Sequence, residues 1–455
     1  ASIGNYHVLI GAFAGSSINS GDADGTTAIG YQAGQILTSG VGSTAIGYQA
    51  LFSATENDYN TAVGARALYS ISGSSGTEGE NNTAVGRYAG YNNTTGVSNV
   101  YVGGGAGYAN TIGNYNNFIG QSAGNSLVDG TNSTYIGWYA AYNQTHGDNN
   151  VVVGHQALYG SSGKGDLSEN VAVGYQSAYK AEAGYGITAV GSRALRNITP
   201  SGSLSTAIGY FSGFNASGSY NTFVGADAGR GGTTSAPFSS GEYNVAVGYQ
   251  SLDAFTTGFR NVGVGKDTLG LLTTGQKNTA IGDEAFFTLG KGNYSVAVGA
   301  AAGYYATGSY NTFMGYEAGK GGTSSAPHSS GEYNTAIGYN ALKGFTTGHE
   351  NTVMGYQAAY SLTSADNNVI IGYQTGYSLT TARYNVLIGD QAGYSLSTSS
   401  DSNENVMIGN SAGRNADADT NAAHYNVYIG SGAGYYMDDG DSNVYIGREA
   451  GKGSG

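Results

Sequence analysis

The sequence predicts an all-β fold: a single parallel β-solenoid (β-roll) of about 25 coils, with 17 residues as the modal coil length. Three observations predict it. A short apolar segment ending in glycine recurs along the whole chain, the spacing of these glycines hardly varies, and the same few residue types recur around them. A fixed period this short is typical of one structural unit stacked on copies of itself, and not of a globule with one central core.

We call the recurring glycine the corner glycine and number the other positions of a coil relative to it. Val, Ile or Met precedes it in all 25 copies. Of the 24 intervals between corner glycines, 14 are 17 residues, and the others range from 16 to 23. Because glycine adopts backbone conformations that are forbidden to other residues, we expect it to turn a corner here. Representative corner glycines are Gly30, Gly47, Gly64, Gly86, Gly338, Gly355 and Gly372.

Positions −1 and −3 predict a strand. Position −3 is Thr or Val in nearly every copy, and side chains two residues apart on a strand point to the same face. The residue between them varies among Ala, Tyr, Phe, Leu and Val, as expected of the opposite face. Position +3 is Ala in 20 copies and Ser or Thr in the other five, which implies close approach of two backbone layers. We therefore expect two short strands in each coil, joined at the corner glycine and closed by a polar loop.

Asparagine occupies position −4 in 18 of the 25 copies. One interpretation is a ladder, in which each side-chain amide bonds the amides of the coils above and below, as in other stacked strands. The alternative is a row of carbohydrate-binding side chains. We favour the ladder, because this position is locked to the period of the fold. Its representative members are Asn82, Asn99, Asn116, Asn150, Asn244, Asn334 and Asn385.

Tyrosine, with 39 residues, is concentrated at positions −5, +1 and +5. Tyrosines at one position of successive coils would stack as aromatic ladders with their hydroxyl ends in water. The simpler role for such rows is packing of one solenoid on another, or covering of an edge. Recognition of glycans by exposed rings is the alternative.

The repeat continues from residue 1 to residue 455 without a shift in composition, which predicts one continuous solenoid domain. We expect longer loops near residues 69–81, 230–243 and 320–333, where the intervals between corner glycines reach 22 or 23 residues. Pro237 and Pro327 lie in two of these loops, in keeping with the exclusion of proline from ladder hydrogen bonds. Such loops are where a solenoid presents something other than its shaft.

The composition of the chain limits which partners and which cellular locations are expected. A net charge of −13 argues against binding of nucleic acid or of an anionic membrane surface. No run of about 18 apolar residues occurs, so we expect no membrane insertion. Cysteine is absent, which excludes disulfides and thiolate metal sites and suits a protein outside the cell. We expect an extracellular, cell-surface or virion location.

Residue patterns that carry catalysis are missing from the sequence. The six histidines share no spacing with carboxylates or serines that would indicate a triad or a metal-binding helix, so we expect neither an enzyme nor a cofactor. Calcium is the one ion considered, because Ca²⁺ accepts carboxylate oxygens on loops. Asp and Gly are, however, also ordinary turn residues. The weak calcium candidates are Asp22, Asp24, Asp417, Asp419, Asp438, Asp439 and Asp441.

Runs such as Thr-Ala-Ile-Gly-Tyr-Gln-Ala resemble the YadA-like head repeat of trimeric autotransporter adhesins and related stretches of phage tail fibres. The best matches are residues 27–34, 44–51, 335–342 and 385–393. In that family the repeat forms a left-handed parallel β-roll that packs as a trimer, and its surface binds host or matrix ligands. The resemblance therefore implies a homotrimer with an adhesive surface. The family repeat is usually shorter than the one in this chain.

Neither end of the chain resembles a polar capping repeat, which solenoids normally need. From Gly447 to the Gly11 of a following copy would be 19 residues, within the observed range of intervals. We therefore expect copies to stack head to tail, a contact that makes filaments. A fragment cut from a longer fibre is the alternative.

Taken together, these patterns predict a structural protomer of an extracellular or virion-associated fibre, whose partners are copies of itself, stacked head to tail or bundled as rods. A second reading is an adhesin or tail-fibre shaft that binds host or matrix glycans. The third is an ice-binding solenoid, which would need a flat and regular Thr array, whereas Thr alternates irregularly with Val here.

Overall fold

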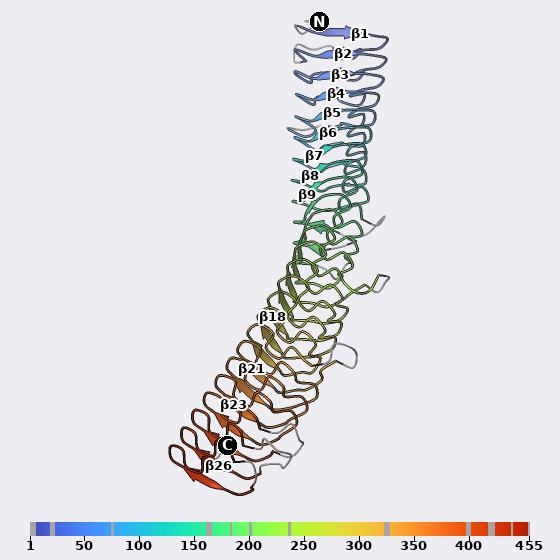
Figure 1. Ribbon diagram of the computed structural model, residues 1–455. Helices are drawn as coiled ribbons and strands as arrows, with labels where there is room; N and C mark the ends of the chain where they lie inside the picture. Colours follow the sequence, from blue (N-terminus) through green and yellow to red (C-terminus); the bar gives the residue numbers. More distant parts are fainter. Residues whose placement is uncertain are drawn as a thin grey trace. The chain divides into compact units, whose positions relative to one another are not determined.

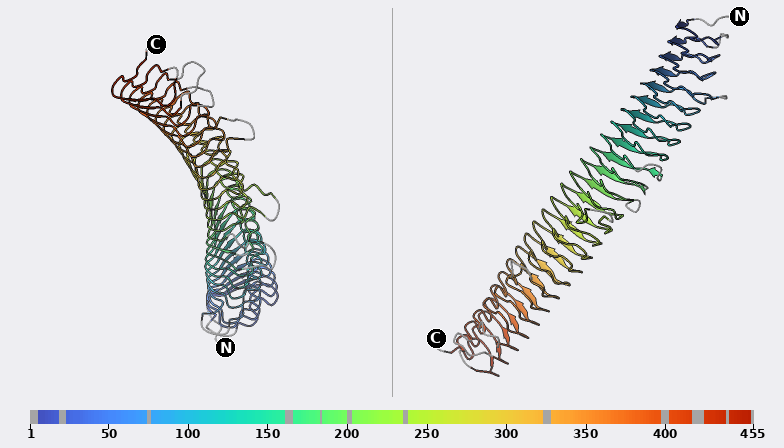
Figure 2. Two further views of the ribbon diagram at one scale, coloured as in Figure 1. Left: turned by 90° about the horizontal axis from the view of Figure 1, so that it is seen from below. Right: turned by 90° about the vertical axis from the view of Figure 1, so that its right-hand side faces the viewer.

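The computed structural model confirms the predicted fold class. The chain is all-β and folds as a parallel β-solenoid whose coils recur about every 17 residues (Figures 1 and 2). The structure describes residues 6–18, 23–73, 77–160, 166–182, 184–199, 203–234, 238–322, 328–396, 402–416, 424–437 and 440–453. It forms two compact units, Ala1–Asn221 and Thr222–Gly455, which are described one by one. The single continuous domain stays a prediction.

Unit 1 contains 12 solenoid strands, each three residues long and each hydrogen-bonded in parallel to the strands of neighbouring coils. They are β1 (Val8–Ile10), β2 (Thr27–Ile29), β3 (Thr44–Ile46), β4 (Thr61–Val63), β5 (Thr83–Val85), β6 (Val100–Val102), β7 (Asn117–Ile119), β8 (Thr134–Ile136), β9 (Val151–Val153), β11 (Val171–Val173), β13 (Thr188–Val190) and β14 (Thr206–Ile208). A separate short pair joins β10 (Leu167–Ser168) to β12 (Gly184–Tyr185).

Unit 2 contains 13 strands of the same kind. They are β15 (Thr222–Val224), β16 (Val245–Val247), β17 (Val262–Val264), β18 (Thr279–Ile281), β19 (Val296–Val298), β20 (Thr312–Met314), β21 (Thr335–Ile337), β22 (Thr352–Met354), β23 (Val369–Ile371), β24 (Val386–Ile388), β25 (Val406–Ile408), β26 (Val427–Ile429) and β27 (Val444–Ile446). Neither unit contains a helix among the residues described, so none there is long and apolar enough to cross a membrane.

Equivalent residues of successive coils lie directly opposite one another. Ala45 of β3 pairs with Ala62 of β4 in unit 1, and Val353 of β22 pairs with Ile370 of β23 in unit 2. In Figure 1, the labelled strands β1 to β9 lie one above the next. Each position of the repeat therefore forms a row that runs from coil to coil, as the period of the sequence predicts.

The variable residue at position −2 forms the core, which sequence reasoning had not assigned to it. From β2 to β9, in β11, and from β13 to β26, the middle residue of the strand is buried, whereas its two neighbours are half-buried or exposed. In several coils a large residue here faces glycine at position +4: a Cβ on Gly107 would lie 2.3 Å from the Tyr101 ring, and one on Gly319 would lie 2.3 Å from the Phe313 ring. The interior is thus filled by complementary sizes.

The second strand expected after the corner glycine does not form, and this prediction was wrong. Positions −5, 0, +2 and +4 have positive φ in every coil, as in Gln49 (53°) and Leu51 (49°). Residues in this left-handed region, alternating with others, curl the backbone into tight turns and prevent an extended strand. Coil-to-coil hydrogen bonds nevertheless continue through the turns, since the Gln49 N–H donates to the Tyr31 carbonyl at 2.9 Å.

Candidate functional site

The asparagines at position −4 form a buried ladder inside the solenoid. The Asn82 Oδ1 atom accepts hydrogen bonds from the Asn99 backbone N–H at 3.0 Å and from the Asn99 side-chain amide at 3.1 Å. The Asn82 Nδ2 atom donates to the Gly96 carbonyl at 2.8 Å, which ties the strand to the loop that closes the coil. Each amide therefore bonds both the neighbouring coil and its own loop.

All seven representative ladder residues are at most 1% exposed: Asn82, Asn99, Asn116, Asn150, Asn244, Asn334 and Asn385. Side chains that are buried and already bonded to protein cannot contact a glycan. Serine replaces asparagine in some coils and keeps part of the ladder, since the Ser133 hydroxyl accepts from the Asn150 N–H at 3.3 Å. The geometry of position −4 is therefore that of a structural element.

The corner glycines have the conformation that their name anticipates. Their φ values lie between +124° and +139°, a region that side-chain-bearing residues rarely adopt. Close packing adds a second constraint, because a Cβ on Gly30 would lie 2.6 Å from the Gly47 carbonyl oxygen of the next coil. The same close approach recurs at Gly47, Gly64, Gly86, Gly338, Gly355 and Gly372, at 2.1 to 2.7 Å. These residues shape the coil and carry no chemistry.

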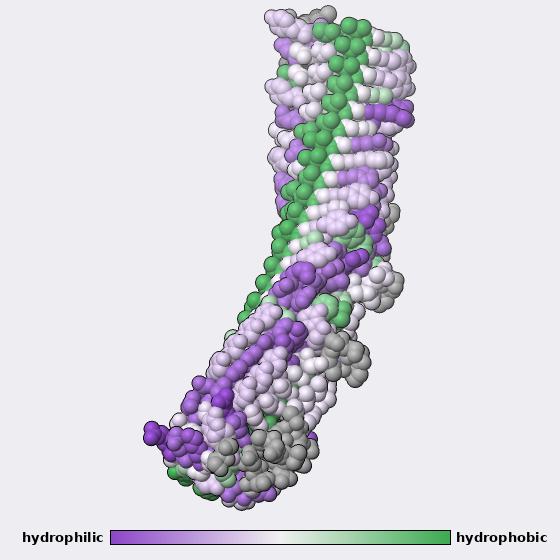
Figure 3. Space-filling view, in the orientation of Figure 1, coloured by the Kyte–Doolittle hydropathy of each residue, from purple (hydrophilic) through white to green (hydrophobic). Residues whose placement is uncertain are grey.

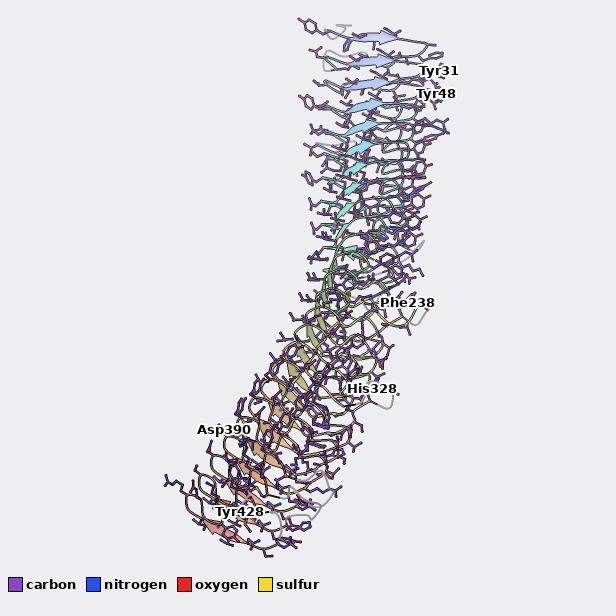
Figure 4. All side chains as sticks on the ribbon, in the orientation of Figure 1. Tyr31, Tyr48, Phe238, His328, Asp390 and Tyr428 are labelled. Atoms are coloured by element: carbon purple, nitrogen blue, oxygen red, sulfur yellow. The ribbon has the colours of Figure 1, made fainter. Side chains whose placement is uncertain are left out.

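Tyrosine rows cover parts of the outer surface. At position +1, the rings of Tyr339, Tyr356 and Tyr373 stack with centroids 5.2 to 5.3 Å apart and planes within 8° of parallel. Tyr31 and Tyr48 form the same contact at the N-terminal end of unit 1 (Figure 4). Further stacked runs occupy position +5 (Tyr69–Tyr91–Tyr108, Tyr142–Tyr159–Tyr179 and Tyr360–Tyr377–Tyr394) and position −5 (Tyr294–Tyr310–Tyr333).

The stacking of the tyrosine rings determines which parts of the rings a ligand could contact. Because the faces of neighbouring rings lie against one another, only ring edges and hydroxyls are presented along a run. Glycan recognition by aromatic platforms needs open ring faces, so it is restricted to the first and last ring of a run. The rows are half-exposed all the same: Tyr339 is 45% and Tyr373 is 49% exposed.

A second polar ladder lies at position −6, and sequence reasoning missed it. The side chain of one coil accepts a hydrogen bond from the backbone N–H at the same position of the preceding coil. Asp148 Oδ1 accepts from the Thr131 N–H at 2.7 Å, and Asp366 Oδ1 accepts from the His349 N–H at 2.8 Å. The signal was present, because Asp, Asn, Ser, Glu or His recurs at this position in many coils.

The weak calcium candidates do not gather into a site in the part of the chain that the structure describes. Asp441 belongs to the polar ladder at position −6, where its Oδ1 accepts a hydrogen bond from the His424 N–H at 2.9 Å. Asp24 lies in a turn whose carbonyl accepts from the Gly42 N–H. Among the described residues, no three His, Asp or Glu side chains are placed to share a metal ion. The remaining candidates, Asp22, Asp417, Asp419, Asp438 and Asp439, lie outside the described residues, so calcium stays a prediction.

One carboxylate is set in a well-defined ionic environment. Glu317 pairs with Lys320 at 2.5 Å and with Lys343 at 2.7 Å, and its side chain is only 12% exposed. Burial raises the pKa of the Glu317 carboxyl, but the two ammonium groups outweigh burial and hold the pKa below its ordinary value. In contrast, burial alone raises the pKa of the Tyr101 hydroxyl, which donates to Asn110 Oδ1 at 2.9 Å.

A shallow pocket of about 340 Å³ lies beside the long loop at 230–243. Tyr243 and Phe259 line it together with Glu242, and the Arg260 guanidinium lies 5.7 Å and 5.9 Å from the two ring centroids. Pro237 and Pro327, the loop prolines, lie outside the described residues. An aromatic, partly charged hollow next to a long loop is one candidate surface for a small ligand.

Comparison with known proteins identifies no family for this chain. No protein-family model matches the sequence, and the search of curated proteins gives no match. The likeness to YadA-like head repeats therefore stays a prediction.

Proposed function

We propose that the protein is a structural protomer of an extracellular or virion-associated fibre, in which copies stack head to tail. The observation that carries this proposal is the continuity of hydrogen bonding from coil to coil, through the strands, the turns and two side-chain ladders. A coil bonded on both sides satisfies its buried polar groups, which favours stacking without a fixed end.

The first and last described strands are the ones that head-to-tail stacking would bring together. β1 and β27 each pair with one neighbour only within the described chain. Their side chains are correspondingly bare: Ile10 is 58% exposed and Ile446 is 68% exposed, whereas the equivalent Ile29 and Ile371 are half-buried. A copy that placed its β1 on β27 of the preceding copy would pair both open edges.

Gly447 offers a sharp test. Its φ is +124°, and the nearest atom to a Cβ added there is the Ala450 Cβ at 4.0 Å, so Gly447→Ala leaves the isolated protomer free of a backbone clash. In a stack, that Cβ would meet the carbonyl of the next coil, as at every inner corner. We expect Gly447→Ala to melt moderately below wild type, because of its φ strain, and to form far shorter filaments in negative-stain micrographs.

Arg448→Ala is the matched control, because Arg448 is the exposed neighbour of Gly447 in the same coil and its removal adds no Cβ against a following coil. Filaments of unchanged length in Gly447→Ala would overturn head-to-tail stacking. A wild-type protein that stays monomeric at high concentration by analytical ultracentrifugation would overturn the fibre as a whole. A mass of three chains in the same measurement would instead support the homotrimer that the resemblance implies.

A second candidate function is an adhesin or tail-fibre shaft, favoured by the pocket of Tyr243, Phe259 and Arg260 beside a long loop. Aromatic rings with nearby polar groups suit a sugar ligand. If this is the function, the wild type should bind immobilised host or matrix glycans, and Tyr243→Ala should abolish that binding. Tyr59→Ala is the control, since Tyr59 is an exposed tyrosine at the same position of another coil and lies outside this pocket.

A further inference from the structure

The outer side of the strands forms an apolar face, which we name the strand face and define as positions −1 and −3 of every coil. Position −1 is Val, Ile or Met throughout, and position −3 is Thr or Val except at Asn117. Several of these side chains are more than one third exposed: Val85 and Ile119 are each 39% exposed in unit 1, and Ile281 and Met314 are 41% and 42% exposed in unit 2. Figure 3 shows part of the face as a green row.

Charge is absent from the strand face. None of its 50 positions carries Asp, Glu, Lys or Arg, although the chain has 30 acidic and 17 basic residues. Two copies that each carry a net charge of −13 repel one another when charged surfaces meet. The strand face is the surface where that repulsion is weakest and where desolvation costs least.

The spacing of side chains on the strand face is matched by a partner surface whose side chains repeat at the same spacing. Side-chain ridges recur at every strand, about 4.8 Å apart, so another copy presents ridges and grooves of equal pitch. Such matching is what lets identical sheet faces interdigitate in a dry contact. A globular partner has no reason to repeat at this spacing.

The area is sufficient for a specific contact. In unit 1 alone, 12 strands about 4.8 Å apart with a face about 10 Å wide offer on the order of 600 Å² per copy. Two copies would then bury on the order of 1,200 Å², above the roughly 1,000 Å² expected of a specific interface. Exposed apolar patches of this size mark interaction sites in soluble proteins.

We propose that the strand face is a lateral interface on which a second copy of this chain packs, sheet face against sheet face. The inference deepens the proposed fibre function by naming the surface through which stacked protomers pair side by side. It needs no head-to-tail contact, so the two proposals fail separately.

The test places charge on the face without changing the fold. Ile119 and Ile429 are 39% and 36% exposed at position −1, and we choose the double variant Ile119→Lys with Ile429→Lys. The matched control puts the same two charges on the outer turns of the same coils, as Gln121→Lys with Ser431→Lys. Because burying an unpaired ammonium is costly, we expect lateral association to weaken about 100-fold or more in the first variant and to stay at the wild-type value in the control.

Sedimentation equilibrium measures the association, and negative-stain micrographs measure filament width and length. Narrow filaments of normal length in the Ile119→Lys/Ile429→Lys variant support both proposals. A wild-type dimer that this variant loses, without filaments in either protein, supports the strand face and overturns the fibre. Equal association in variant and control overturns the strand face. Circular dichroism checks that both variants keep the wild-type fold, and Ile119→Thr with Ile429→Thr is the milder replacement if lysine unfolds the protein.

Discussion

The two walls of each coil reach the same hydrogen bonding by different means. The strand wall, positions −6 to −1, is mainly extended, and side chains at positions −4 and −6 add bonds to the backbone ladder. The turn wall, positions 0 to +5, alternates left-handed residues and depends mostly on backbone bonds such as Gln32 N–H to the Ala12 carbonyl at 2.9 Å. Side chains thus add bonds on the strand wall, whereas the backbone makes most of the bonds on the turn wall.

The corner glycine joins the two walls, and its replacement should have the largest effect. Gly120 has a φ of +133°, and a Cβ there would lie 2.5 Å from the Gly137 carbonyl oxygen. Gly120→Ala therefore combines backbone strain with a clash that only a backbone shift can relieve. We expect a loss of about 3 kcal/mol or more, seen as a lower urea midpoint by circular dichroism.

Gly447→Ala separates these two causes, because it carries the strain without the clash in an unstacked protomer. We expect it to cost clearly less than Gly120→Ala when both are measured below the concentration at which copies associate. Equal losses would mean that φ strain alone explains the corner, and the close approach of coils would lose its importance.

On the strand wall, the ladder should be the most sensitive element. Asn261 Oδ1 accepts from the Asn278 N–H at 3.1 Å, and Asn261 Nδ2 donates to the Gly275 carbonyl at 2.9 Å. Asn261→Leu would leave both backbone groups buried without a partner, at a cost of about 3 kcal/mol in the free energy of unfolding.

Serine is the matched replacement, since Ser295 holds the same position and its hydroxyl accepts from the Asn311 N–H at 3.1 Å. We expect Asn261→Ser to cost about 1 kcal/mol, because the acceptor is kept and the donor bond to Gly275 is weakened. If the leucine and serine variants unfold at the same urea concentration, the ladder contributes packing only.

On the turn wall, the stacked tyrosines should contribute less. Tyr356 contacts Tyr339 at 5.2 Å and Tyr373 at 5.3 Å between ring centroids. Tyr356→Ala removes both contacts from a surface that is already 43% exposed, so we expect a loss of about 1 to 2 kcal/mol. Tyr356→Phe keeps the rings stacked and should melt with the wild type; a loss as large as that of alanine would assign the effect to the hydroxyl.

The sequence predicted the strand wall better than the turn wall for a physical reason. The β-branched residues and the asparagines of the strand wall are each required by one local contact. The same residue types therefore recur at the same positions, and this periodicity is visible in the sequence. On the turn wall, Gln32 and Leu51 share left-handed backbone without sharing chemistry, because neighbouring coils and not their own side chains hold them there. The core position could not be predicted for another reason. Position −2 varies in residue type, and its interior location is recognised only when a large residue there is matched with glycine at position +4, as Phe313 is with Gly319.

Acidification should weaken the turn wall of unit 2 at one point. The lowered pKa of Glu317 means that the folded state favours the charged carboxylate more than the unfolded chain does. Its contribution is present above the ordinary pKa of glutamate and is lost as the pH falls through the lowered value. We expect Glu317→Gln to lower the melting temperature at pH 7 by an amount that corresponds to about 1 kcal/mol, and to match the wild type at a pH below that lowered value. A difference between the two proteins that does not change with pH would mean that the ion pairs with Lys320 and Lys343 contribute nothing.

The smallest effect should come from left-handed residues that face solvent. Glu169 has a φ of +61° and is exposed, and its N–H donates to the Asp148 carbonyl at 2.9 Å, a backbone bond that any residue can keep. Asparagine tolerates this conformation better than glutamate, so Glu169→Asn should stabilise the protein by about 0.5 kcal/mol. Glu169→Val, β-branched and poorly suited to positive φ, should destabilise it by about 1 kcal/mol, measured in the same urea titration. If both variants unfold together with the wild type, the backbone is free of strain at this position, and the variety of residues found at position −5 then reflects an easy conformation instead of one that neighbouring coils impose.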